Sequence, residues 1–147
     1  MPQPSLTWVG PDHPEIAGLV EAQQRELAAD NPPDHVPYPL KSGIEFVLLR
    51  RGDAVLACAA LQRLDPRTVE LKRMYVVPPA RGRRLSKVLL AAIAERAREY
   101  GVTRIRLETS LAFRAAVATY RSSGYVPIPP FGDYLGDPLS YCMELVL

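Results

Sequence analysis

The most informative segment of the sequence reads VELKRMYVVPPARGRRLSKVLL, residues 69–90. Its first part is typical of a strand, and its last part has the apolar spacing of an amphipathic helix. The loop between them carries Arg81, Arg83 and Arg84. The first N–H groups of a helix lack intrahelical partners and lie at the positive end of its dipole, so they can bind phosphate. The segment predicts a phosphate site, although a solvated basic helix face would give the same pattern.

The length and composition predict a single domain over residues 1–147. Hydrophobic residues make up 48% of the chain and charged residues 23%, as is usual for a soluble globular protein. The net charge of +2 is too small to indicate a nucleic-acid partner. The sequence shows neither a membrane-spanning apolar run nor a secretory signal, so we expect a cytoplasmic protein with no membrane partner. Cys58 and Cys142 are expected to be buried free thiols.

Apolar periodicity and turn residues divide the rest of the chain into helices and strands. Helices are expected from Pro14 to Asn31, from Leu85 to Tyr100, and from Ser110, as N-cap, to Gly124. Strands are expected at Ser5–Val9, Glu45–Arg50, Ala54–Leu64, Thr68–Val77, Arg104–Thr109 and Leu139–Leu147, with an irregular segment over residues 127–138. The short connections between residues 45 and 77 require an antiparallel meander. The order of elements predicts an α/β fold with a mixed sheet.

The basic loop is similar to the pyrophosphate loop of the GNAT superfamily of acetyl-CoA-dependent N-acetyltransferases. That loop has Arg or Gln, two variable residues, Gly, one variable residue, and then Gly or Ala. Arg81 holds the first position, while Arg84 and Ser86 replace the two small residues. We expect Arg84 to have a helical conformation, which needs no glycine. The likeness covers roughly residues 45–147, and the segment 129–140 is similar to a small, uncharacterised bacterial branch of the family.

The resemblance implies a GNAT fold, with a mostly antiparallel central sheet, flanking helices and a splayed central strand. It also implies acetyl-CoA as cosubstrate, with no metal. The expected cofactor-binding residues are Met74, Tyr75, Val76, Arg81, Gly82, Arg83, Arg84, Leu85 and Ser86. His13 and His35 stand apart from any Cys or acidic pair at metal-ligand spacing, which also argues against a metal site.

The family pattern implies that Tyr120 is the general acid, because a tyrosine four residues before the Gly-aromatic turn faces the coenzyme A sulfur. Without the family pattern, Tyr120 would be interpreted as a packed aromatic residue on a helix. Glu70, on the strand before the loop, is the candidate base, and Glu108 is its rival. Glu70 could instead be a surface carboxylate paired with Lys72 or Arg104.

The resemblance implies an N-acetyltransferase that moves an acetyl group directly to a primary amine of a small molecule or amino-acid-like acceptor. A catalytically weak CoA-binding or regulatory module of the same fold is the alternative, favoured by Arg84 and by Phe113 at a position where the family has Asn. The acceptor face is expected to include His35, Tyr38, Arg73, Phe131 and Tyr134. Family members often dimerise through their C-terminal strands, so a homodimer through Leu139–Leu147 is possible.

Overall fold

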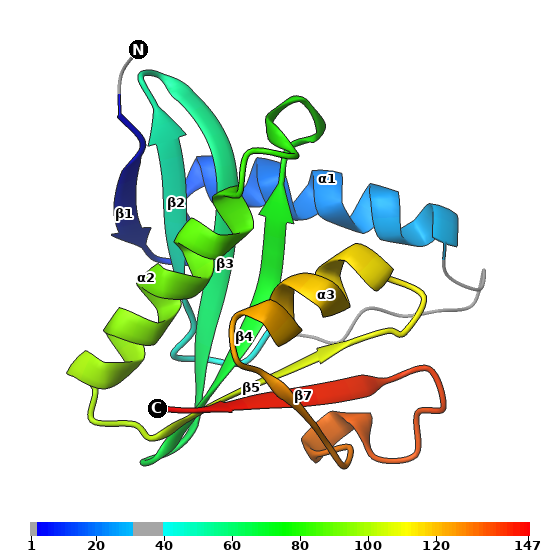
Figure 1. Cartoon of the computed structure of the whole chain (residues 1–147). Helices are drawn as coiled ribbons and strands as arrows, with labels where there is room; N and C mark the ends of the chain where they lie inside the picture. Colours follow the sequence, from blue (N-terminus) through cyan, green and yellow to red (C-terminus); the bar gives the residue numbers. More distant parts are fainter. Residues whose placement is uncertain (1–2, 31–39) are drawn as a thin grey trace.

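The computed structural model describes residues 3–30 and 40–147 and contains a single sheet flanked by helices (Figure 1). The helices are α1 (Pro14–Asp30), α2 (Leu85–Glu99) and α3 (Arg114–Ser122), with short 3-10 turns η1 (Pro78–Ala80) and η2 (Gly132–Tyr134). The strands are β1 (Ser5–Val9), β2 (Glu45–Arg51), β3 (Ala54–Asp65), β4 (Thr68–Val76), β5 (Arg104–Thr109), β6 (Val126–Ile128) and β7 (Tyr141–Val146). The expected α/β class is confirmed.

The sheet has the order β1-β2-β3-β4-β5-β7-β6, and its only parallel pair within the described residues is β4 with β5. That pairing covers only Thr68–Glu70 of β4, opposite Arg104–Arg106 of β5. Beyond Glu70, β4 pairs with β3 alone, while β5 pairs with β7 along its whole length. The sheet therefore opens between its two central strands, which confirms the expected splay.

The two faces of the sheet carry separate cores. On one face α2 packs with β2, β3 and β4 around Leu89, Ile93 and Ile105. On the other face α1 packs through Ile16 and Leu19 around Phe46. Figure 1 shows α1 and α2 on opposite sides of the sheet. The apolar spacing of the two helices fits this arrangement, because each buries a single stripe.

Two local expectations were wrong. The segment 127–138, expected to be irregular, contains the end of β6 and the turn η2. Helix α3 begins at Arg114 with Phe113 as its N-cap, not at Ser110. The Ser110 hydroxyl instead accepts a hydrogen bond from the N–H of Ala112 at 3.2 Å, which closes a turn before the helix. No helix among residues 3–30 and 40–147 is long and apolar enough to cross a membrane.

Candidate active site

An irregularity in β4 lies just beyond the point where β4 and β5 separate. Three residues of β3, from Cys58 to Ala60, stand opposite four residues of β4, from Tyr75 to Lys72. The extra residue is a bulge, and Arg73 within it has a φ of 54°. Bulges bend a strand and increase its twist, so this one directs the end of β4 away from β5.

Side chains, not a neighbouring strand, satisfy two carbonyls of β4 beyond the bulge. The Met74 carbonyl accepts a hydrogen bond from Nε2 of Gln23, in α1, at 2.9 Å. The Val76 carbonyl accepts one from Nε of Arg81, also at 2.9 Å. These contacts leave β4 ordered without a strand on that side. The expected contact of Met74, Tyr75 and Val76 with the cofactor stays a prediction.

The loop between η1 and α2 has two residues in the left-handed region. Gly82 has a φ of 80° and Arg84 a φ of 61° with a ψ of 24°. The expected helical conformation at Arg84 is wrong, because this residue adopts the backbone conformation that glycine accepts most easily. Arg84 is also the N-cap of α2, and no side chain of the described residues caps that helix. The first N–H groups of α2 are therefore open to an anion.

Replacing Arg84 should reveal the strain of this conformation. Arg84→Gly and Arg84→Ala remove the same charge, but only glycine relieves the left-handed φ. We expect the glycine variant to be more stable than the alanine variant by about 1 kcal/mol. Urea unfolding of the two variants measures the difference. Equal midpoints would contradict a strained residue 84.

A pocket of about 540 Å³ lies where β4, the loop, the start of α2 and α3 meet. Its lining comprises Met74, Tyr75, Val76, Ala80, Arg81, Gly82, Arg84, Leu85, Ser86, Lys87, Ala115, Ala116, Thr119 and Tyr120. All of the expected cofactor-binding residues except Arg83 belong to this lining, and Arg83 is exposed on the same loop. The pocket joins a backbone edge, a helix N-terminus and several cations, which is an environment suited to a long anionic ligand.

Tyr120, on α3, brings a buried aromatic hydroxyl to this lining. Its side chain is 8% exposed, and its ring lies 5.9 Å from that of Tyr125. Burial raises the pKa of Tyr120 to about 12, and the charge of Glu108 adds to the shift. The hydroxyl therefore stays protonated at neutral pH and can act as a donor.

Glu70 lies at the point where β4 and β5 separate, on the sheet face opposite Val69 and Leu71. It is 4% exposed and accepts a hydrogen bond from the hydroxyl of Tyr134. Its carboxylate lies 4.0 Å from Nζ of Lys72, while Arg104 pairs with Glu144. Burial raises the pKa of Glu70 above its usual value. The interpretation of Glu70 as a surface carboxylate is wrong, because its side chain is buried. The expected pairing of Glu70 with Lys72 is present.

Glu108, the rival base, lies on β5 two residues beyond Arg106, the residue that stands opposite Glu70. It therefore shares the sheet face of Glu70. It accepts a hydrogen bond from Oγ of Ser140 at 2.6 Å. Burial raises the pKa of Glu108, and the charges of Asp137 and Glu70 raise it further. Two hydroxyls of the segment 134–140 thus each donate to a carboxylate, one to the buried Glu70 and one to the half-buried Glu108. Neither carboxylate lines the pocket that contains Tyr120.

The expected acceptor residues are only partly within the described structure. The rings of Phe131 and Tyr134 meet edge to face at 5.2 Å, and Nζ of Lys72 lies 6.0 Å from the Tyr134 ring. Arg73 is half-buried in the β4 bulge, where burial lowers the pKa of its guanidinium. His35 and Tyr38 lie outside the described residues. Among the expected acceptor residues, Tyr134 contacts the candidate base Glu70 through its hydroxyl.

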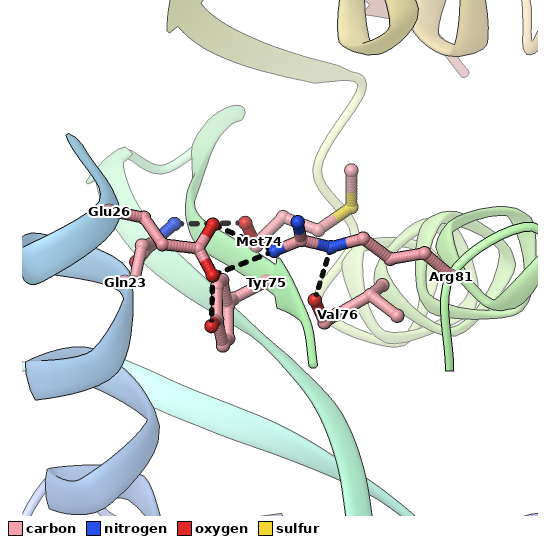
Figure 2. A network of polar contacts seen from close by, with 6 residues as sticks. All are labelled: Gln23, Glu26, Met74, Tyr75, Val76 and Arg81. Atoms are coloured by element: carbon pink, nitrogen blue, oxygen red, sulfur yellow. Dashed lines mark hydrogen bonds and ion pairs between the residues drawn. The ribbon is translucent and has the colours of Figure 1, made fainter. Parts of the chain in front are cut away.

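Sequence reasoning missed one group of residues near the pocket. Glu26, in α1, accepts hydrogen bonds from the hydroxyl of Tyr75 at 2.6 Å and from Nη2 of Arg81 at 2.8 Å (Figure 2). Arg81 therefore directs its guanidinium toward α1 and the Val76 carbonyl. A binding role for Arg81 toward the cofactor stays a prediction. The helical spacing of residues 14–31 gave no sign of the role of Glu26.

The chain thus has an α/β fold in which β4 and β5 splay apart, and the helix between them in the sequence, α2, starts at a pocket beside the open edge of β4. Residues 18–125 match the Acetyltransferase (GNAT) family. The chain belongs to this family and is an acyltransferase of the acyl-CoA-dependent N-acetyltransferase type.

Known proteins are similar to this chain in sequence and in fold. The chain is 32% identical over 150 residues to the IAA acetyltransferase of Azospirillum brasilense, covering 98% of each chain. A solved acyl-CoA N-acyltransferase structure from Klebsiella pneumoniae is 29% identical, covers 99% of this chain and 98% of its own, and superimposes with a TM-score of 0.85. A GNAT family acetyltransferase from Elizabethkingia anophelis with acetyl-CoA bound has the same fold, at a TM-score of 0.75 and 12% identity over 98% of each chain.

Proposed function

We propose that this chain transfers an acetyl group from acetyl-CoA directly to a primary amine of a small-molecule or amino-acid-like acceptor. The observation that carries the proposal is the pocket in which the open edge of β4, the start of α2 and Tyr120 meet. We also propose that residues 1–147 act as one domain, since all strands of the described residues join one sheet.

The residues of the pocket fit acetyl-CoA. Arg84 and Lys87 bring two cations to the uncapped start of α2, and Arg83 adds a third on the same loop. Phosphates are stabilised by such N–H groups and by nearby cations. The backbone of Met74, Tyr75 and Val76 offers amide groups for the pantetheine arm, which has amides of its own. A strand edge without a strand partner binds extended groups through its main chain.

Acetyl-CoA supplies the activated acyl group as a thioester. Glu70 accepts a proton from the attacking amine, directly or through water, because a raised pKa makes a carboxylate a stronger base. Tyr120 donates a proton to the departing sulfur. The carbon–nitrogen bond forms, the carbon–sulfur bond breaks, and one proton passes in balance from nitrogen to sulfur through the protein and water.

The region around Glu70, where we propose that the acceptor binds, carries both acidic and basic side chains. This supports an amino-acid-like acceptor. Glu70 and Glu108 are acidic groups that can receive an amine, while Lys72 and Arg73 stand on β4 beside Glu70. Lys41 adds a cation and pairs with Asp133 at 3.4 Å across this side. A zwitterion could place its amine toward the carboxylates and its carboxylate toward the cations.

Calorimetry with acetyl-CoA, followed by a thiol-release assay on a panel of amines, tests the proposal. The panel should contain amino acids, simple amines, peptides and IAA, the compound in the name of the Azospirillum relative. We expect saturable binding that weakens at high salt, because cations bind the phosphates, and thiol release with a small primary amine. Binding without release from any acceptor would favour the CoA-binding module, and no binding would overturn both readings.

The oligomeric state follows from a separate observation. Val126, Leu139 and Val146 are large apolar residues more than half exposed, and they lie on the edge strand β6 or on and just before its neighbour β7. Edge strands with exposed apolar residues favour pairing with another chain. We propose a homodimer through this edge, which light scattering during gel filtration would detect as twice the chain mass.

A further inference from the structure

Helix α1 makes polar contacts with the open end of β4 and with the basic loop (Figure 2). Gln23 donates to the Met74 carbonyl at 2.9 Å, and Arg81 donates to the Val76 carbonyl at the same distance. Both carbonyls belong to the part of β4 that has lost β5 as a neighbour. Backbone carbonyls in half-buried positions need partners, and here side chains from two other elements supply them.

Glu26 connects these contacts into one network. Its carboxylate accepts from the Tyr75 hydroxyl at 2.6 Å and from Nη2 of Arg81 at 2.8 and 3.0 Å. The guanidinium also lies 5.6 Å from the centre of the Tyr75 ring. The hydrogen bonds from Tyr75 and Arg81 hold the pKa of Glu26 below its usual value, so the carboxylate is charged at neutral pH. The charge of Arg81 is thereby neutralised from the side of α1.

We propose that Glu26 and Gln23 are positioning residues for acetyl-CoA, which hold the open edge of β4 and the basic loop in the geometry that binds the cofactor. Glu26 fixes the Arg81 side chain, and Arg81 fixes the loop to the Val76 carbonyl. The phosphates of acetyl-CoA then bind the first N–H groups of α2 and the side chains of Arg83, Arg84 and Lys87. Glu26 itself touches neither the phosphates nor the acetyl group.

The variant Glu26→Gln tests this role, because it keeps the shape and removes the charge that binds Arg81. We expect the Kd and KM for acetyl-CoA to rise about fivefold, with kcat within about twofold of wild type. The modest size reflects the partial exposure of Glu26 and Arg81. The inference rests on the proposed function, and wild-type binding separates the two. A wild type that does not bind acetyl-CoA refutes the function, whereas equal binding by wild type and variant refutes only the positioning role.

Two controls distinguish positioning from a general loss of stability. Glu21→Gln removes another carboxylate from α1, whose partner Arg25 lies on the same helix at 3.6 Å, and should leave the Kd unchanged. In an Arg81→Gln background, Glu26→Gln should have little further effect, since its partner is gone. Tighter binding by Glu26→Gln would mean that Glu26 competes with the phosphates for Arg81, and full additivity of the two substitutions would show no shared role. Either result would overturn the proposal.

Discussion

Tyr120→Phe is expected to lower kcat about 100-fold while leaving the Kd for acetyl-CoA within about twofold of wild type. The substitution removes one hydroxyl from the pocket and keeps the ring that packs against Tyr125. Since the pKa of Tyr120 is raised to about 12, its hydroxyl is a proton donor throughout the neutral range. Without this donor, negative charge builds up on the departing sulfur, which slows cleavage of the carbon–sulfur bond. Stopped-flow thiol detection and calorimetry on the same preparation measure the two quantities.

Tyr125→Phe is the matched control. Its ring is the neighbour of Tyr120, and burial likewise raises the pKa of its hydroxyl, but it does not line the pocket. We expect near-normal kcat from this variant. A similar loss in both variants would indicate that packing of the aromatic pair matters, not proton donation. Full activity of Tyr120→Phe would remove Tyr120 from the mechanism.

The sequence predicted the elements that have a strong apolar period and missed those that do not. Helix α2 and strands β3 and β4 were expected almost at their observed bounds, because each buries a regular stripe. Strand β6 was missed because it has three residues with proline in the centre, a composition that only an edge strand tolerates. Ser110 resembled an N-cap, yet α3 begins four residues later and the Ser110 hydroxyl closes a turn before it.

Within the site, the sequence did not reveal the backbone conformation of the basic loop or the contacts between residues far apart in the chain. A left-handed backbone is rare for an arginine, so Arg84 itself gave no sign of it, although the family motif has Gly at this position. Glu26 and Arg81 are separated by 55 positions, and Tyr134 and Glu70 by 64, so neither pair has a local signature. The family motif located the loop, but only the fold shows that α1 holds it.

Glu70→Gln is the second substitution with a large expected effect, and we expect kcat/KM for the amine to fall about 100-fold at neutral pH. The variant can still accept the hydrogen bond from Tyr134 through its amide oxygen, so the site should keep its shape. What it loses is the ability to take a proton. Glu108→Gln provides the matched comparison on β5, and a greater loss in that variant would make Glu108 the base.

The pH dependence separates a base from a structural carboxylate. Wild-type kcat/KM should rise as Glu70 loses its proton, at a pH above the ordinary value of 4.5 because burial raises its pKa. Without Glu70, the rate should rise only toward the pKa of the free amine, about 10.4 for a lysine-like acceptor. An unchanged profile in Glu70→Gln would exclude Glu70 as the base.

We expect Glu70→Gln to be more stable than wild type at neutral pH, although it is less active. A carboxyl whose pKa is higher in the folded state binds its proton more tightly there than in the unfolded chain. The free energy of unfolding therefore falls as pH rises from the unfolded value of about 4.5 through the raised folded value. At neutral pH, charged Glu70 destabilises the fold, and Glu70→Gln should unfold at a higher temperature than wild type. Below pH 4.5 this advantage should vanish, because Glu70 is protonated in both states. A less active but more stable variant is the signature of a carboxylate kept buried for catalysis, and a variant that loses both would instead mark Glu70 as part of the structural pairing with Lys72.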